Sequence, residues 1–173
     1  MSKIEELCKA FTNARKLFNQ YEADCTEFAK EIWNRFIQYY EIPLSQVSLH
    51  NFDAYGAADK ISGFDELEMG LREDGYFEFG IGITLFELPK VFPYPHFTII
   101  LPIDISIDKS GKYKAKYGEN GKEFIINKDR DTDFINLFDE IFKLLISEYE
   151  EGLSNIRLQN TFRKIGFQKQ GED

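Results

Sequence analysis

Two histidines and one aspartate are the residues whose types suit acid–base or metal chemistry. His50 and Asp53 are separated by two positions, and His96 lies further along the chain. If the fold brought the three side chains together, they could form an acid–base group or a metal site. Because a histidine at a strand end is more often structural, we treat His50, Asp53 and His96 as an alternative site, and we expect no cofactor and no metal.

Two other groups of residues have patterns that invite a chemical interpretation. Asp104 and Asp108 share one face of a predicted strand, as paired carboxylates would, but lysines across the hairpin explain them better. Gly80 and Gly82 fall within a strand, so they do not form a phosphate-binding loop. They indicate either sheet curvature or a face approached by a partner's backbone. The chain has no nucleotide-binding motif, and we expect a binding protein rather than an enzyme.

Three alternating stretches predict the strands that position these residues. In Tyr76–Phe86 every second residue from Phe77 to Leu85 is apolar, which is the period of a β-strand. Phe97–Asp108 repeats the pattern, and Lys112–Tyr117 alternates with its lysines outward. Val47–Phe52 can form a further short strand, whereas residues 53–66 are predicted to be irregular.

Turn residues fix how these strands pair. Lys109-Ser110-Gly111 is a three-residue hairpin loop ending in a glycine, which adopts a positive φ at little cost. The loop places Ile105 opposite Ala115 on the apolar face. On the other face it sets polar residues against lysines: Asp104 against Lys116, Ser106 against Lys114, and Asp108 against Lys112. Opposite charges in such positions add roughly 0.2–1 kcal/mol per pair.

Two further turns extend the same meander. Glu73-Asp74-Gly75 is a loop of the same type, and it sets Leu71 opposite Phe77 and Met69 opposite Phe79. Asn120-Gly121 is the strongest two-residue hairpin signal. It predicts that Tyr117 faces Phe124 and that Ala115 faces Ile126.

A long helix is predicted over residues 2–41. Its apolar residues recur at alternating steps of three and four, at Ile4, Leu7, Phe11, Ala14, Phe18, Tyr21, Cys25, Phe28, Ile32 and Phe36. Ser2 is a plausible cap for its first turn, and a break near Asp24–Glu27 is the alternative to one continuous helix. Unbroken, it would span about 57 Å at 1.5 Å per residue, so one end must overhang, bend or meet a partner.

The C-terminal part predicts helices that cover the sheet. Acidic residues from Asp129 to Asp133 begin a helix that Gly152 should end, and residues 154–165 can form a shorter one. The predicted fold is α+β with two layers, an antiparallel meander of about five strands whose apolar face is covered by the N-terminal and C-terminal helices. We expect a single domain over 1–173, with the meander in 46–127 and the last helices in 131–166.

The charge distribution restricts the class of partner. The net charge is −9, with −6 in residues 46–95 and −4 in residues 129–173, which argues against direct nucleic-acid binding. No apolar run is long enough to cross a membrane. Cys8 and Cys25 lie about 25 Å apart on one predicted helix, so they cannot bridge, and we expect a reducing, cytoplasmic location.

A proline-stiffened loop beside acidic residues is the predicted partner-binding surface. Phe92 and Tyr94 alternate with prolines, and rigid aromatic side chains lose little entropy on binding. The acidic residues that precede them are Asp65, Glu66, Glu68, Glu73 and Asp74. The function hypothesis is an acidic, non-catalytic protein-binding module, such as a bacterial or phage inhibitor that masks a basic toxin, nuclease or defence enzyme. The alternatives are a small-ligand-binding or enzymatic domain with a pocket between sheet and helices, and a structural subunit that forms homo-oligomers through the long helix.

Overall fold

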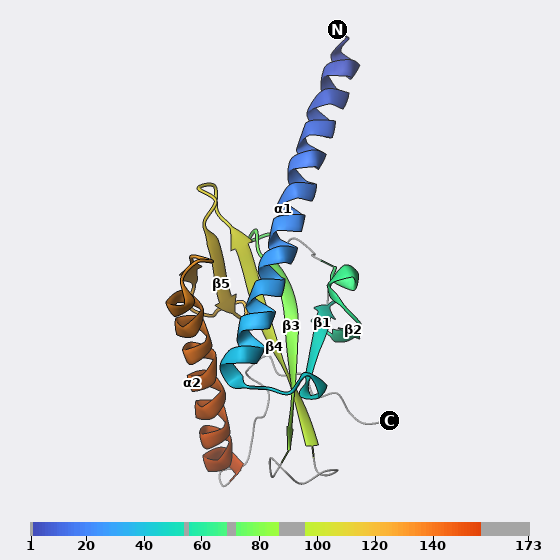
Figure 1. Cartoon of the computed structure of the whole chain (residues 1–173). Coiled ribbons are helices and arrows are strands. Elements are labelled where there is room, and N and C mark those ends of the chain that lie inside the picture. The colour runs from blue at the N-terminus through green and yellow to red at the C-terminus, as the bar shows by residue number, and fades with distance from the viewer. Residues whose placement is uncertain (1, 54–55, 69–71, 87–95, 157–173) are drawn as a thin grey trace.

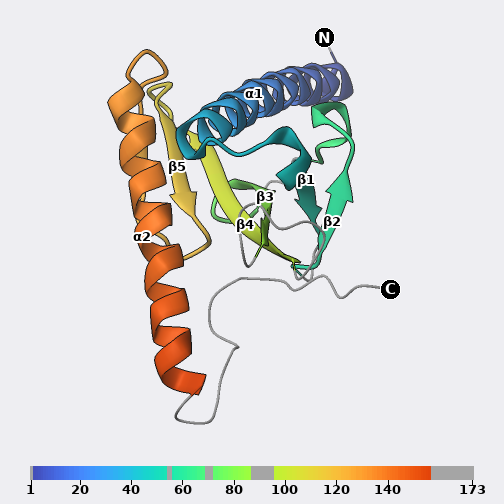
Figure 2. The same cartoon turned by 60° about the horizontal axis from the view of Figure 1, so that its bottom comes forward.

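A computed structural model describes residues 2–53, 56–68, 72–86 and 96–156. Helix α1 crosses one face of a six-stranded antiparallel sheet, and helix α2 packs beside it (Figures 1 and 2). The strand order is β2-β1-β3-β4-β5-β6. The elements are α1 (Lys3–Tyr40), β1 (Val47–Phe52), β2 (Ala58–Ile61), β3 (Phe77–Phe86), β4 (His96–Ile107), β5 (Tyr113–Tyr117), β6 (Phe124–Ile126) and α2 (Asp131–Ile156), with single 3-10 turns at Leu44–Gln46 and Phe64–Glu66.

The predicted α+β architecture is confirmed, with one strand more than expected. The additional strand is β2, which lies in the segment that was predicted to be irregular, and it pairs with β1 at the edge of the sheet. β1 in turn pairs with β3, so that Leu49 faces Ile81 and His50 faces Gly80. The predicted pairings of Met69 and Leu71 lie outside the described residues.

The hairpin between β4 and β5 has the predicted register. Ile105 faces Ala115, Ile107 faces Tyr113, and Asp104 faces Lys116. Gly111 has a φ of 78° and Gly75 a φ of 83°, as loops of this type require.

The register predicted for β5 and β6 is wrong by two residues. Phe124 faces Ala115 and not Tyr117, and Ile126 faces Tyr113. The turn is centred one residue earlier than the Asn-Gly pair, since Gly118 takes a positive φ and its carbonyl accepts the Gly121 amide at 3.2 Å. A slip of two residues keeps every side chain on its predicted face, so Ile126 is still buried.

Helix α1 is continuous, and only its C-terminal half belongs to the core. Ser2 and Glu5 form a capping box at its start. Its buried side chains point into the inner face of the sheet: Cys25, Phe28, Ala29, Ile32 and Phe36. They pack on alternate residues of β3 and β4, including Phe79, Ile81, Leu101 and Ile103.

Residues 3–20 of α1 extend beyond the sheet, and we call this segment the α1 overhang (Figure 1). All its residues are exposed, and it is about 27 Å long at 1.5 Å per residue. The helix meets the sheet at Tyr21, whose hydroxyl accepts the Ile107 amide at 3.1 Å and donates to the Gly75 carbonyl at 3.4 Å. Of the alternatives that the helix length predicted, the structure shows an overhang.

Helix α2 closes the other side of the core. Phe134, Leu137, Phe138 and Ile141 are buried, and the Phe138 ring lies 5.5 Å from the Phe36 ring in an edge-on contact. Gly152 does not end this helix, which continues to Ile156. A glycine within a helix costs only about 1 kcal/mol relative to alanine, so it does not by itself force a stop. The third helix predicted at 154–165 lies mostly outside the described residues.

Candidate functional site

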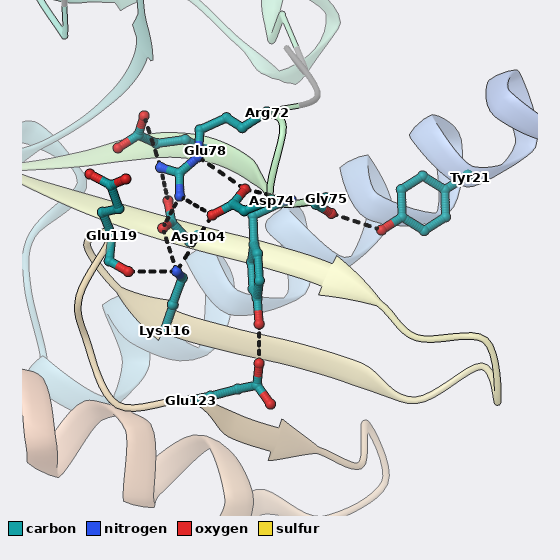
Figure 3. A network of polar contacts seen from close by, with 10 residues as sticks. Tyr21, Arg72, Asp74, Gly75, Glu78, Asp104, Lys116, Glu119 and Glu123 are labelled. Carbon is teal, nitrogen blue, oxygen red and sulfur yellow. Dashed lines mark hydrogen bonds and ion pairs between the residues drawn. The ribbon is translucent and has the colours of Figure 1, made fainter.

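A cluster of charged side chains lies on the face of the sheet that points away from the helices (Figure 3). The Arg72 guanidinium contacts the Asp104 carboxylate at 3.0 Å, the Asp74 carboxylate at 2.7 Å and the Glu78 carboxylate at 3.7 Å. The Lys116 ammonium lies 3.6 Å from Asp104 and 3.7 Å from Asp74. We call these five residues the ion-pair cluster.

Burial distinguishes the members of the ion-pair cluster. Asp104 has no exposed surface and Lys116 is 8% exposed, although the sequence pattern placed the lysines of β5 outward. Burial raises the pKa of both Asp104 and Glu78, whereas a hydrogen bond from Arg72 lowers the pKa of Asp74 to about 2. Each acid thus has a cation within reach, and the cluster is satisfied internally.

The ion-pair cluster fastens the turn at residues 72–76 to the sheet. The Lys116 ammonium donates to the Glu119 carbonyl at 2.6 Å and lies 4.4 Å from the centre of the Tyr76 ring. The sequence predicted the contact of Asp104 with Lys116 but not the part of Arg72. The need for a further cation could be recognised once the β3–β4 register is known, because Glu78 faces Asp104 across the two strands. Two acids facing each other are unfavourable without a cation.

A second polar group lies two strands away from β4, where β1 pairs with β3. His50 is buried, and its Nε2 lies 2.8 Å from the Ser48 Oγ. Gly82 provides the space for this pair, since a Cβ atom there would stand 2.6 Å from His50 Nε2. The glycines therefore accommodate side chains of the same sheet, and the space above them is not open to a partner's backbone. His50 Nδ1 has no hydrogen-bond partner within the described part of the chain.

Acid is expected to destabilise the fold through His50. Burial lowers the pKa of His50, with Lys60 lowering it further and Asp59 opposing. The unfolded chain takes up a proton below about pH 6.5, before the folded chain does. His50 therefore does not reduce the free energy of unfolding above pH 6.5, and it reduces that free energy progressively as the pH falls toward the folded pKa. Urea denaturation measures the free energy of unfolding at pH 7.5 and at pH 5. Its decrease between the two pH values should be smaller for His50→Gln than for the wild type.

A matched variant tests whether that pH dependence belongs to His50. His96→Gln removes the other histidine of the chain, and it should keep the decrease in stability seen in the wild type. An equal decrease for His50→Gln and the wild type would contradict the assignment.

The structure does not bring the alternative site together. His50 faces Gly80 on β3, whereas His96 faces Phe86. Six strand positions separate the two, about 20 Å at 3.3 Å per residue. Asp53 follows the C-terminal end of β1. Its carboxylate accepts the Ala57 amide at 2.7 Å. Within the described ranges, no three histidine, cysteine or acidic side chains are grouped so that they could hold a metal ion.

The acidic residues predicted to bind a partner fall into two places. Phe64 of the 3-10 turn packs edge-on against Trp33 at 6.0 Å, and Gly75 of the other turn contacts Tyr21. Those contacts are twelve residues apart on α1, about 18 Å. Asp65, Glu66 and Glu68 thus lie near the outer strand β2, and Glu73 and Asp74 lie near the start of β3. Phe92 and Tyr94 lie outside the described residues.

The first of these places carries unpaired negative charge. Asp59, Asp65, Glu66 and Glu68 are exposed, and we call them the acidic edge. None of the four is in an ion pair in the part of the chain that the structure describes. Asn51 holds their backbone, accepting the Glu68 amide at 3.1 Å and donating to the Glu66 carbonyl at 3.0 Å. The acids are therefore held in place on a structured segment.

Comparisons with protein-family models, with curated proteins and with solved structures give no match for this chain. In the described portion, neither helix combines the length and the apolar character needed to span a membrane.

Proposed function

We propose that the protein is a non-catalytic protein-binding module whose partner has a basic surface. The observation that carries the proposal is the acidic edge, where four exposed carboxylates on one short segment form no ion pair with any residue that the structure describes. The acids of the ion-pair cluster, in contrast, are neutralised by Arg72 and Lys116. Unpaired like charges repel one another, and a cationic partner would relieve that repulsion.

The charge of residues 21–156, which we call the body, supports the same class of partner. Residues 21–156 contain 13 Lys and Arg against 26 Asp and Glu, a net charge of −13. Such a field accelerates encounter with a basic protein and repels nucleic acid. An inhibitor that masks a basic toxin, nuclease or defence enzyme fits this description.

Reversing charge at the acidic edge is expected to reduce capture of that partner. Asp65→Lys with Glu68→Lys is the best pair, because Glu66 also accepts the Ser62 amide at 2.8 Å and supports the turn. Affinity capture from a lysate of the source organism, read by quantitative mass spectrometry, should give a basic protein with the wild type and at least about tenfold less of it with this variant.

A second charge reversal serves as the control for that experiment. Asp129→Lys with Glu150→Lys changes the net charge equally, at exposed positions outside the acidic edge, and should retain the partner. Equal capture by all three baits, or capture of an acidic protein, would refute the proposal.

A further inference from the structure

The α1 overhang presents a row of large apolar side chains that nothing in the described structure covers. Ile4, Leu7 and Phe11 are 63–65% exposed, Leu17 is 73% exposed and Phe18 is 41% exposed. A row of this kind on a regular helix is typical of a protein interface. The overhang also has a net charge of +2, opposite in sign to the body.

The spacing of the row is that of a coiled coil. Its apolar residues repeat every 3.5 residues on average, which keeps one seam facing a partner helix. Ile4, Phe11 and Phe18 occupy one core position of the heptad, and Leu7 and Ala14 occupy the other. The same seam continues along α1 to Cys25 and Phe28, which pack on the sheet of their own chain.

That continuity decides the direction of any partner helix. A parallel helix on the seam would run alongside Cys25 and Phe28, where β3 and β4 already lie. An antiparallel helix leaves the seam at the N-terminal end of α1, where no other element of the described structure lies (Figure 1). Only an antiparallel partner therefore fits without collision.

We propose that two copies of this chain associate through their α1 overhangs as an antiparallel helix pair. In the register that overlaps the full overhang, Phe11 faces the partner's Ala14, and Leu7 faces the partner's Phe18. Phe11, one of the two largest side chains of the row, then meets Ala14, the smallest, as close packing favours.

Flanking residues match in the same register. In an antiparallel pair the residues beside the core of one helix meet their equivalents on the other. Lys3 is then placed beside the partner's Asp24, and Ala10 beside the partner's Leu17. The two-fold axis makes each contact twice. A parallel in-register pair would offer Lys3 no acid at its flank, because the position it meets is the partner's Cys8.

The size of the interface sets the strength to expect. Five large apolar side chains from each copy, at roughly 100 Å² each, bury on the order of 1,000 Å². That area is near the lower limit for a specific interface, so the dimer should dissociate on dilution. It would carry two acidic edges, and a partner with two basic sites would bind it with a gain from bivalency.

Sedimentation velocity of the full chain tests association. Over about a hundredfold range of concentration, the wild type should pass from monomer to dimer. Phe11→Glu alters a side chain that is not part of the hydrophobic core of its own chain, and it should weaken the dimer at least about tenfold. Asn13→Glu adds the same charge on the far side of the overhang and should leave dimerisation unchanged. A wild type that stays monomeric, or equal effects of the two variants, would overturn the proposal.

Disulfide trapping tests direction, in a background where Cys8→Ser removes the exposed thiol. Leu7→Cys and Phe18→Cys chains, mixed and oxidised, should form a crosslinked dimer. Each alone should not, because its equivalent on the partner lies eleven helical residues away, about 16 Å, beyond the reach of a disulfide. Crosslinking of either variant with itself would refute the antiparallel arrangement. The acidic edge is untouched in all these variants, so loss of dimerisation and loss of partner capture are separate results.

Discussion

Phe138→Ala is expected to lower the free energy of unfolding by about 3–5 kcal/mol. The Phe138 side chain is 1% exposed, and its ring packs edge-on against Phe36 and beside Phe134. Removing it leaves a cavity between α1 and α2, where the surrounding rings can collapse only in part. Urea denaturation followed by circular dichroism measures the loss. Ile103→Ala, in the centre of β4, should cost about 2–5 kcal/mol for the same reason.

Phe142→Ala is the matched control, because Phe142 lies one helical turn further along the same helix and is 48% exposed. Less of its surface leaves water on folding, so the expected loss is about 1 kcal/mol. If the two phenylalanine variants lost the same stability, the assignment of the buried face of α2 would be wrong.

Arg72→Met is expected to cost about 3 kcal/mol, because it leaves the carboxylate of Asp104 buried with Lys116 as its remaining cation. Asp104→Asn should cost less. Arg72 then retains Asp74 and Glu78, and it is partly exposed to water. Denaturation of the two single variants and the double variant forms a cycle, in which the double variant should lose less than the sum.

The pH dependence of the Arg72→Met variant provides a second check. Burial already raises the pKa of Asp104, and loss of the guanidinium should raise it further. A folded-state pKa above the unfolded value is unfavourable at neutral pH, and the penalty is relieved as the pH falls through it. The difference in the free energy of unfolding between Arg72→Met and the wild type should therefore become smaller from pH 7 to pH 4. A constant difference would mean that Asp104 is not the source of the loss.

The sequence by itself determined the elements whose signals are local. The β4–β5 hairpin is an example, since the loop at Lys109-Ser110-Gly111 and the alternation on both sides agree on one register. Helix α1 is another, because the cap at Ser2 and the apolar period predict one long helix, and the structure shows it without the alternative break near Asp24–Glu27. In both cases neighbours in the chain are also neighbours in space, and local chemistry is enough.

Tertiary structure decided the features that depend on distant partners. Asn120-Gly121 predicted a turn centred on that pair, but the turn forms one residue earlier. There the Gly118 amide donates to the Pro102 carbonyl on the neighbouring strand. β2 was missed because four residues with a weak pattern become a strand only by pairing with β1.

Burial of polar side chains is the other property that the sequence did not reveal. Alternation places Asp104 and Lys116 on the outer face, but it does not say that this face is buried around them. Arg72 reaches Asp104 from 32 residues away, and no local pattern records such a contact. The apolar repeat of α1 likewise comes from the sequence, whereas the antiparallel direction that we propose for a partner helix rests on the position of the sheet that packs on α1.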